Sequence, residues 1–145
     1  TLSGGNYVYD YHLFNVNAEF TPFEIPFMET KLPVRFYADY VKNRAEDVKD
    51  KEGYLFGVKV GSAKNKNTWE IGYDYRRLEA DAITEFMADG SFSQGGTDCK
   101  GHTYGFKYAV SDNSTLGISY MATEGLGNRK RVDVNTIQID YVVAF

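Results

Sequence analysis

Apolar and polar residues alternate along most of this chain. A period of two is the mark of a β-strand, because successive side chains of a strand point to opposite faces. The alternation is clearest at the C-terminus, where one face would carry Ile137, Ile139, Tyr141, Val143 and Phe145. The pattern predicts seven strands in total, at residues 6–20, 31–42, 54–61, 69–76, 104–110, 116–122 and 133–145.

The first of these segments changes phase. Tyr7 and Tyr11 fall on one face, whereas Phe14 and Phe20 fall on the other. A β-bulge near His12 and Leu13 would produce this change, and the alternative is that the segment forms two short strands. Residues 21–30 contain two prolines and no clean alternation, so we expect them to be a connection.

The connections alternate between short and long. The loops at 43–52, 78–101 and 123–132 are long, and the turns at 62–67 and 111–114 are short. Short periplasmic turns and longer external loops are typical of outer-membrane barrels. In the longest loop, a helical spacing predicts a short amphipathic helix carrying Ala80, Ile83, Phe86 and Met87.

Composition favours an all-β domain. Of the 145 residues, 43% are hydrophobic and 16% aromatic, and aromatic residues suit a pleated surface. A mean hydropathy of -0.43 excludes a membrane-spanning helix but not a membrane barrel, because alternation hides lipid-facing residues from the average. The expected fold is an antiparallel up-and-down transmembrane β-barrel, with residues 1–145 forming one domain.

The predicted number of strands is odd, which would leave a barrel unclosed. Bacterial single-chain barrels have an even number, and an open sheet would expose two unpaired edges to lipid. The chain starts at Thr1 without Met or a visible signal peptide. We therefore expect a processed chain or a fragment, and specifically the C-terminal portion of a larger barrel.

The terminal strand ends on an aromatic residue in phase with its apolar face, with a tyrosine four positions earlier. This arrangement resembles the terminal targeting strand of Gram-negative outer-membrane β-barrels. The resemblance implies two partners, which are outer-membrane lipid and the barrel-assembly machinery that would bind this strand. Association of several copies of the chain stays open.

The orientation of the faces separates a membrane barrel from a soluble one, because charged residues line the lumen of the former and cover the exterior of the latter. Small residues such as Gly57 and Gly72 recur on the polar face, and Tyr40 and Tyr141 lie near strand ends on the apolar face. Both observations favour the membrane orientation. The predicted pore-lining residues are Arg35, Asp39, Lys59, Glu70, Asp74, Arg76, Lys107 and Asp140.

The loop at 78–101 is long and acidic. If it folds into the lumen, its acids would face Arg35, Arg76 or Lys107 across a constriction, and the opposed charges would set a transverse field with a mild cation preference. These predicted constriction acids are Glu79, Asp81, Glu85 and Asp89. The alternative is a lid or a surface loop.

Other chemistry has little support. A net charge of -4 and a pI near 5.2 argue against a nucleic-acid partner. Cys99 is the one cysteine and has no metal-ligand spacing around it, and the loop acids lack the pattern of a calcium loop. An enzyme would have to pair His102 with Asp98 or Cys99, which in a Gly-rich loop is more often a turn. We expect no catalytic residue, metal or cofactor.

Several stretches resemble one family. RRLEADA at 76–82 and GGTDCKGH at 95–102 are similar to the C-terminal half of the putative porins of Gram-negative bacteria. The similarity extends to YADYVKN, EGYLFGVKVG and the terminal DVNTIQIDYVVAF, and so covers nearly the whole chain beyond the first segment. The resemblance implies a β-barrel in the outer membrane and carries no residue roles with it.

The function expected from these features is passive diffusion of small hydrophilic solutes or ions through an outer-membrane pore, without catalysis. A soluble β-barrel that binds a small hydrophobic ligand is one alternative. A structural or adhesive outer-membrane barrel is the other.

Overall fold

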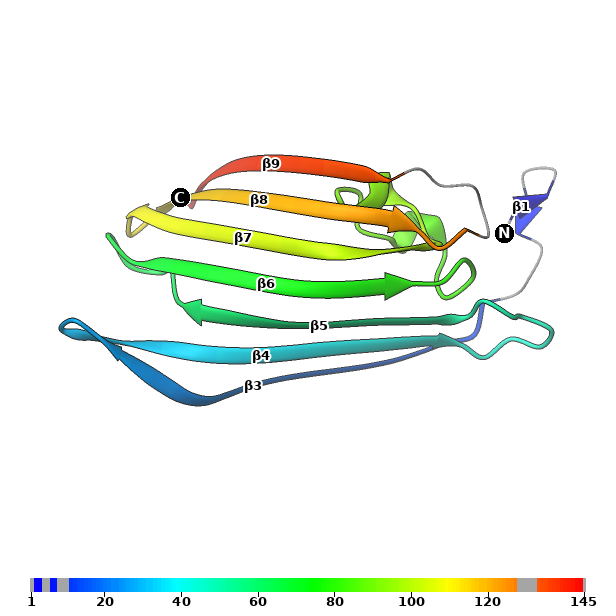
Figure 1. Cartoon of the computed structure of the whole chain (residues 1–145), viewed down its shortest axis with the longest axis horizontal. Coiled ribbons are helices and arrows are strands. Elements are labelled where there is room, and N and C mark those ends of the chain that lie inside the picture. Colours follow the sequence, from blue (N-terminus) through cyan, green and yellow to red (C-terminus); the bar gives the residue numbers. More distant parts are fainter. Residues whose placement is uncertain (1, 4–5, 8–10, 128–132, 145) are drawn as a thin grey trace.

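The computed structural model describes residues 2–3, 6–7, 11–127 and 133–144. Its main element is one antiparallel sheet of seven strands in up-and-down order (Figure 1). The strands are β3 (Leu13–Phe27), β4 (Thr30–Asn43), β5 (Glu52–Gly61), β6 (Trp69–Leu78), β7 (Cys99–Ser111), β8 (Ser114–Gly125) and β9 (Val134–Val143). The sheet is open between β3 and β9 and forms a partial barrel, so the predicted all-β, up-and-down fold is confirmed.

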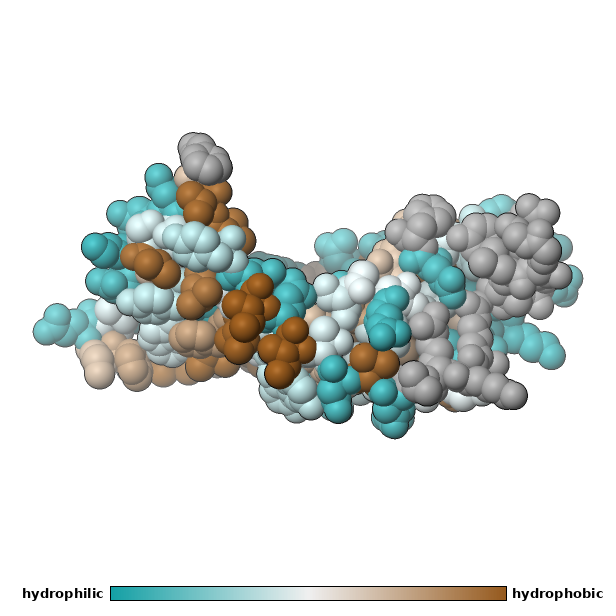
Figure 2. Space-filling view, turned by 90° about the horizontal axis from the view of Figure 1, so that it is seen from above, coloured by the Kyte–Doolittle hydropathy of each residue, from teal (hydrophilic) through white to brown (hydrophobic). Residues whose placement is uncertain are grey.

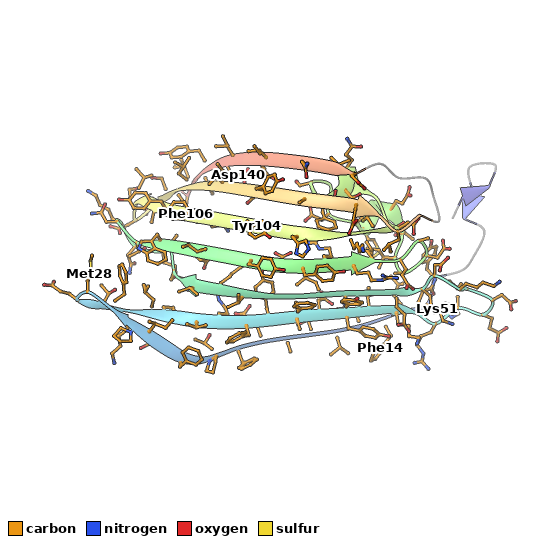
Figure 3. All side chains as sticks on the ribbon, viewed as in Figure 1. Phe14, Met28, Lys51, Tyr104, Phe106 and Asp140 are labelled. Atoms are coloured by element: carbon orange, nitrogen blue, oxygen red, sulfur yellow. The ribbon has the colours of Figure 1, made fainter. Side chains whose placement is uncertain are left out.

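The two ends of the sheet differ. Short turns at 28–29, 62–68 and 112–113 lie at one end, here called the turn end, at the left of Figure 1. The connections β4–β5, β6–β7 and β8–β9 lie at the other, the loop end; in the last of these, residues 128–132 are outside the described part. Met28 and Lys51 mark the two ends in Figure 3. The predicted alternation of short and long connections is confirmed.

The prediction for residues 21–30 is wrong. Residues 21–27 continue β3, and the turn to β4 is Met28 and Glu29 alone. Pro22 lies in a register shift between Phe20 and Phe23. A proline has no backbone N–H to donate. It is accommodated there because β3 is an edge strand of this sheet, and its open side has no neighbouring strand to accept a hydrogen bond.

The predicted bulge near His12 and Leu13 is also wrong. Asn6 and Tyr7 form β2, which pairs with β1 (Leu2–Ser3) in a separate two-stranded sheet, and β3 begins only at Leu13. The change of phase therefore reflects two separate strands, which was the alternative.

The predicted helix in the longest loop does not form. Two short 3-10 segments take its place, η1 (Glu85–Met87) and η2 (Phe92–Gly95). A segment of so few residues makes too few helical hydrogen bonds to offset the cost of helix nucleation. The backbone is bound elsewhere instead, since Asp81 N donates to Asp50 O at 2.7 Å and Thr97 Oγ1 donates to Ala80 O at 2.8 Å. Within the described residues, no helix is long and apolar enough to cross a membrane.

The strand register gives the sheet one apolar face. Seven consecutive ladder partners form a row across it, namely Phe20, Phe36, Val58, Tyr73, Tyr104, Tyr120 and Ile137. This face is not enclosed, because side chains such as Ile71, Ile118 and Ile139 are exposed. Figure 2 shows hydrophobic residues gathered over the middle and the turn-end half of the molecule. Buried side chains gather instead at the loop end, where Phe92, Cys99 and Met121 form a cluster.

Candidate functional site

The eight predicted pore-lining residues all lie on the face opposite the apolar row. Five of them line one hollow of about 260 Å³ over β5–β7, namely Lys59, Glu70, Asp74, Arg76 and Lys107. The other three lie around it. Arg35 reaches the hollow through Glu70, whereas Asp39 accepts from Asn15 at 2.5 Å and Asp140 accepts from Gln138 at 2.9 Å.

Glycines form the floor of the hollow. Gly72 pairs with Lys59 on one side and with Gly105 on the other. A Cβ on Gly72 would lie 3.5 Å from Lys59 Cγ, so the lysine stem lies across this glycine. The absence of side chains here leaves the space that the surrounding charged residues line.

Arg35 connects strands on both sides of β4. Its guanidinium donates to Glu70 on β6 at 2.8 Å and to Glu19 on β3 at 3.4 Å. The Glu70 side chain is only 12% exposed, so its charge depends on this partner for compensation. The pair therefore neutralises one of the two carboxylates of the hollow.

Tyr37 was not among the predicted site residues, although its strand position places it on the polar face. Its hydroxyl donates to Asp74 Oδ2 at 3.2 Å, and Lys59 Nζ lies 5.1 Å from the centre of its ring. Gly57 separates Tyr37 from Asp74 in the ladder, and a Cβ on Gly57 would lie 2.6 Å from the Tyr37 hydroxyl oxygen. The glycine is required for this close approach.

The β6–β7 loop folds onto the loop end of the polar face. Asp89 accepts from Arg76 at 3.2 Å, and the Arg76 guanidinium carbon lies 4.6 Å from the centre of the Phe92 ring. Phe92 is 2% exposed and packs with Met121 of β8. A second hollow, of about 520 Å³, separates the loop residues Ile83 and Met87 from β3–β6. No sequence signal indicated the role of Phe92, because the Gly-rich stretch around it has no period.

The predicted constriction acids do not lie together. Asp89 pairs with Arg76. Glu79 instead pairs with Arg77 at 3.4 Å, and Asp81 is buried, with the Tyr11 hydroxyl 3.5 Å from its carboxylate. Glu85 is half-buried in η1. Asp89 thus contacts a predicted pore-lining cation, and Arg76 balances its charge.

The apolar face ends in ion pairs at the loop end. Lys42 pairs with Glu52 at 2.6 Å and Lys100 with Glu124 at 3.0 Å. The ladder places these pairs beyond Tyr40, Tyr54 and Tyr75 on the same face. Continuing the alternation past these tyrosines would have identified this charged border, which the sequence analysis missed.

The histidine considered for catalysis lies on the wrong face for a dyad. His102 Nδ1 lies 2.8 Å from the Tyr73 hydroxyl on the apolar face, whereas Cys99 has the opposite strand parity, is buried and donates to Gly96 O. Within the described residues there is no group of three His, Cys, Asp or Glu side chains that could hold a metal.

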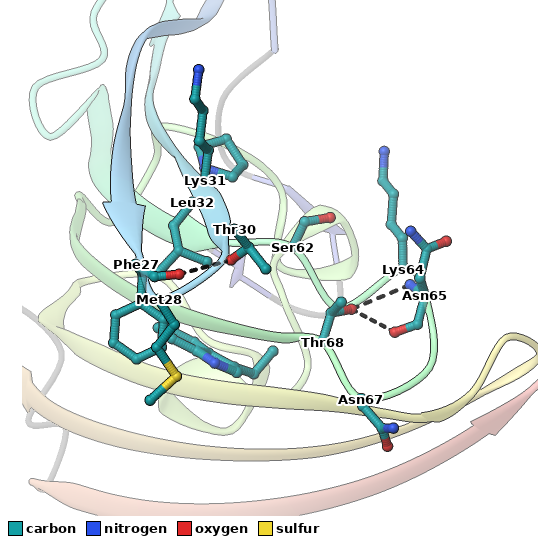
Figure 4. A pocket seen from close by; sticks show the side chains of 12 residues that line it. Phe27, Met28, Thr30, Lys31, Leu32, Ser62, Lys64, Asn65, Asn67 and Thr68 are labelled. Carbon is teal, nitrogen blue, oxygen red and sulfur yellow. Dashed lines mark hydrogen bonds between the residues drawn. The ribbon is translucent and has the colours of Figure 1, made fainter.

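A third hollow, of about 470 Å³, lies at the turn end between the β3–β4 and β5–β6 turns (Figure 4). The Phe27 ring meets Trp69 edge-on at 5.7 Å. Thr30 donates to Phe27 O and Thr68 to Asn65 O, so these hydroxyls stabilise their own turns. Lys31 and Lys64 extend away from Phe27 and Met28 (Figure 4).

Residues of the terminal strand lie as predicted with respect to its faces. Ile137, Ile139, Tyr141 and Val143 are exposed on the apolar side of β9, each of them at a ladder position. Phe145 lies outside the described residues.

Comparison with known proteins identifies one family. A family model described as putative porin matches residues 5–145. No curated protein and no solved structure matches the chain.

Proposed function

The chain belongs to the putative porin family, and from this premise we propose that it forms part of a pore for passive diffusion of small hydrophilic solutes or ions. We place this pore in the outer membrane of a Gram-negative bacterium, with the polar face toward water and the apolar face toward lipid.

The observation that carries the proposal is the separation of the two faces. One face has an exposed apolar row across seven strands, and the other carries the network of Arg35, Glu70, Asp74 and Arg76. A lipid bilayer is the environment in which an exposed apolar face is favourable. A soluble ligand-binding barrel would enclose that face, yet Ile71, on the inner strand β6, is 51% exposed.

The height of the apolar stretch fits a bilayer. On β8 it is bracketed by Ser114 and Glu124, which both have the parity of the apolar face. The ten residue steps that separate these two polar borders span about 33 Å, or about 25 Å along the membrane normal at a tilt near 40°. This equals the usual height of the apolar band of a membrane barrel.

The predicted pore-lining residues keep that role in the proposal, and the β6–β7 loop narrows the lumen at the loop end. Support for the loop comes from the Asp89–Arg76 ion pair and the buried ring of Phe92. Two of the other three predicted acids, Glu79 and Asp81, lie at the loop end, where their bonds fix the start of the loop.

The decisive experiment reconstitutes the full-length protein in planar bilayers and tests each face separately. In a Cys99→Ala background, Thr103→Cys places a thiol on the polar face and Tyr104→Cys places one on the apolar face. A charged, membrane-impermeant thiol reagent should react with the first variant and reduce its conductance, and leave the second unchanged. Absence of conductance, or reaction only at position 104, would contradict the proposal.

We also propose that the terminal strand binds the barrel-assembly machinery. Phe145→Ala should lower the yield of assembled protein, whereas Val142→Thr, on the polar face of β9, should not. Equal yields of assembled protein from Phe145→Ala and the parent would contradict this role.

A further inference from the structure

We propose that the glycine-floored hollow on the polar face is a binding site for a small oxyanion that carries a hydroxyl group, with monohydrogen phosphate as the simplest example. This inference rests on the proposed pore function and names the class of solute that the pore retains along its path.

The cations of the hollow provide the attraction. Lys59 and Lys107 both line it, and neither forms an ion pair with a carboxylate among the residues described. Arg76 adds a third positive charge, which Asp89 balances. Two lysines on a concave surface, neither paired with a carboxylate of the described residues, are available to a dissolved anion.

The carboxylates of the hollow are already engaged. Glu70 is paired with Arg35, and Asp74 accepts from the Tyr37 hydroxyl through Oδ2. Another acid, Asp140, shares the space above Gly117 with Lys107, because a Cβ on Gly117 would lie 3.8 Å from Asp140 Cβ and 3.8 Å from Lys107 Cγ. Asp140 accepts from Gln138 and forms no ion pair with Lys107. These bonds leave the lysines as the free charges of the site.

Two residues that line the hollow each have a buried side-chain atom without a hydrogen-bond partner. Arg76 Nε is a donor and Asp74 Oδ1 an acceptor, and both are buried without a partner. Buried polar groups are normally hydrogen-bonded, so this donor and this acceptor, which belong to residues two apart in β6, are both open to a ligand that supplies an acceptor and a donor. An anion that also has an O–H satisfies both atoms, the oxyanion at Arg76 and the hydroxyl at Asp74.

This arrangement predicts discrimination between two dianions of similar shape. Sulfate at mildly alkaline pH is a pure acceptor, whereas monohydrogen phosphate has one hydroxyl to donate to Asp74. A site that bound anions by charge alone would not separate them. Hydroxyls of Thr103 and Ser119, which also line the hollow, can donate to either ion.

The test is block of the chloride current through the full-length protein in planar bilayers by added phosphate or sulfate. We expect phosphate to block at a concentration about tenfold below that of sulfate, which corresponds to about one additional hydrogen bond. Lys59→Gln and Lys107→Gln should each raise the half-blocking concentration of phosphate about tenfold. Lys64→Gln removes an exposed charge in the β5–β6 turn and should leave it unchanged.

Asp74→Asn is the discriminating variant. It should bring phosphate and sulfate to the same half-blocking concentration while conductance in chloride, which reports correct folding, is retained. If the pore conducts but phosphate and sulfate block equally in the parent, or if the lysine variants behave as Lys64→Gln does, the oxyanion site is excluded and the pore function stands. Loss of all conductance in the parent would instead exclude the pore function on which the site rests.

Discussion

The hydroxyl of Tyr37 on β4 reaches across the whole width of β5 to donate to Asp74 on β6. The intervening ladder position is Gly57, over which the phenol ring lies. One side-chain bond thus ties together two strands that are not neighbours, and it holds one wall of the hollow.

Gly57→Ala should destabilise the protein. An added Cβ would lie 2.6 Å from the Tyr37 hydroxyl oxygen and 2.7 Å from Tyr73 O, so the ring must move and its bond to Asp74 is lost. We expect a loss of about 1–3 kcal/mol, from one hydrogen bond to a charged group and the strain of overpacking. Denaturant unfolding in detergent micelles measures it. Gly105→Ala is the matched control, because its Cβ would meet only Ser119 Oγ at 3.8 Å.

Phe92→Ala should release the β6–β7 loop from the polar face. The ring is 2% exposed, and truncating a buried phenylalanine costs about 3–5 kcal/mol. Hydrogen–deuterium exchange at residues 79–98 should accelerate, since local opening becomes easier. Met87→Ala removes an exposed side chain of the same loop and serves as the control. Unchanged exchange in Phe92→Ala would show that the ring does not anchor the loop.

The ion pairs of the two faces should differ in strength. Double-mutant cycles of Arg35→Gln with Glu70→Gln, and of Lys42→Gln with Glu52→Gln, compare a shielded pair with an exposed one. We expect a coupling energy of about 1–3 kcal/mol for the first pair and a smaller one for the second, because water screens the exposed charges. Unfolding free energies of the four single and two double variants give both values. Equal coupling energies would mean that water screens the Arg35–Glu70 pair as strongly as the Lys42–Glu52 pair.

A charge on the apolar face should prevent stable insertion into lipid. Ile118→Arg puts an arginine near the middle of the band, where the cost is about 2–4 kcal/mol in a bilayer. Thr136→Arg, on the polar face of the neighbouring strand, should cost little. Folding into lipid vesicles, followed by denaturant titration, measures both. In a soluble protein an exposed Ile118 would tolerate the change within about 0.5 kcal/mol, so similar stabilities would contradict the membrane orientation.

The strands could be read from the sequence because each is long and two-faced, and a slip of one residue would move every side chain to the wrong face. The exception is the second half of β3. Pro22 and Pro26 argue against a strand locally, and only the sheet topology, which puts β3 at an edge, makes them acceptable.

The site was predictable only in part, for a related reason. Alternation placed Lys59 and Asp74 on one face, but a period carries no information about which side chains bond across strands. Tyr37 reaches Asp74 because a glycine lies between them, and Phe92 is buried because Met121 lies beneath it. Both facts depend on long-range register, which local pattern does not encode.

Arg76 has two roles, since its guanidinium pairs with Asp89 of the β6–β7 loop and its side chain also lines the hollow. Thermodynamic linkage then makes the two reciprocal. If docking of the loop changes the free energy of anion binding, then a bound anion changes the free energy of loop docking by the same amount. In the proposed pore, the same guanidinium would therefore make the width of the passage depend on the anion that occupies it.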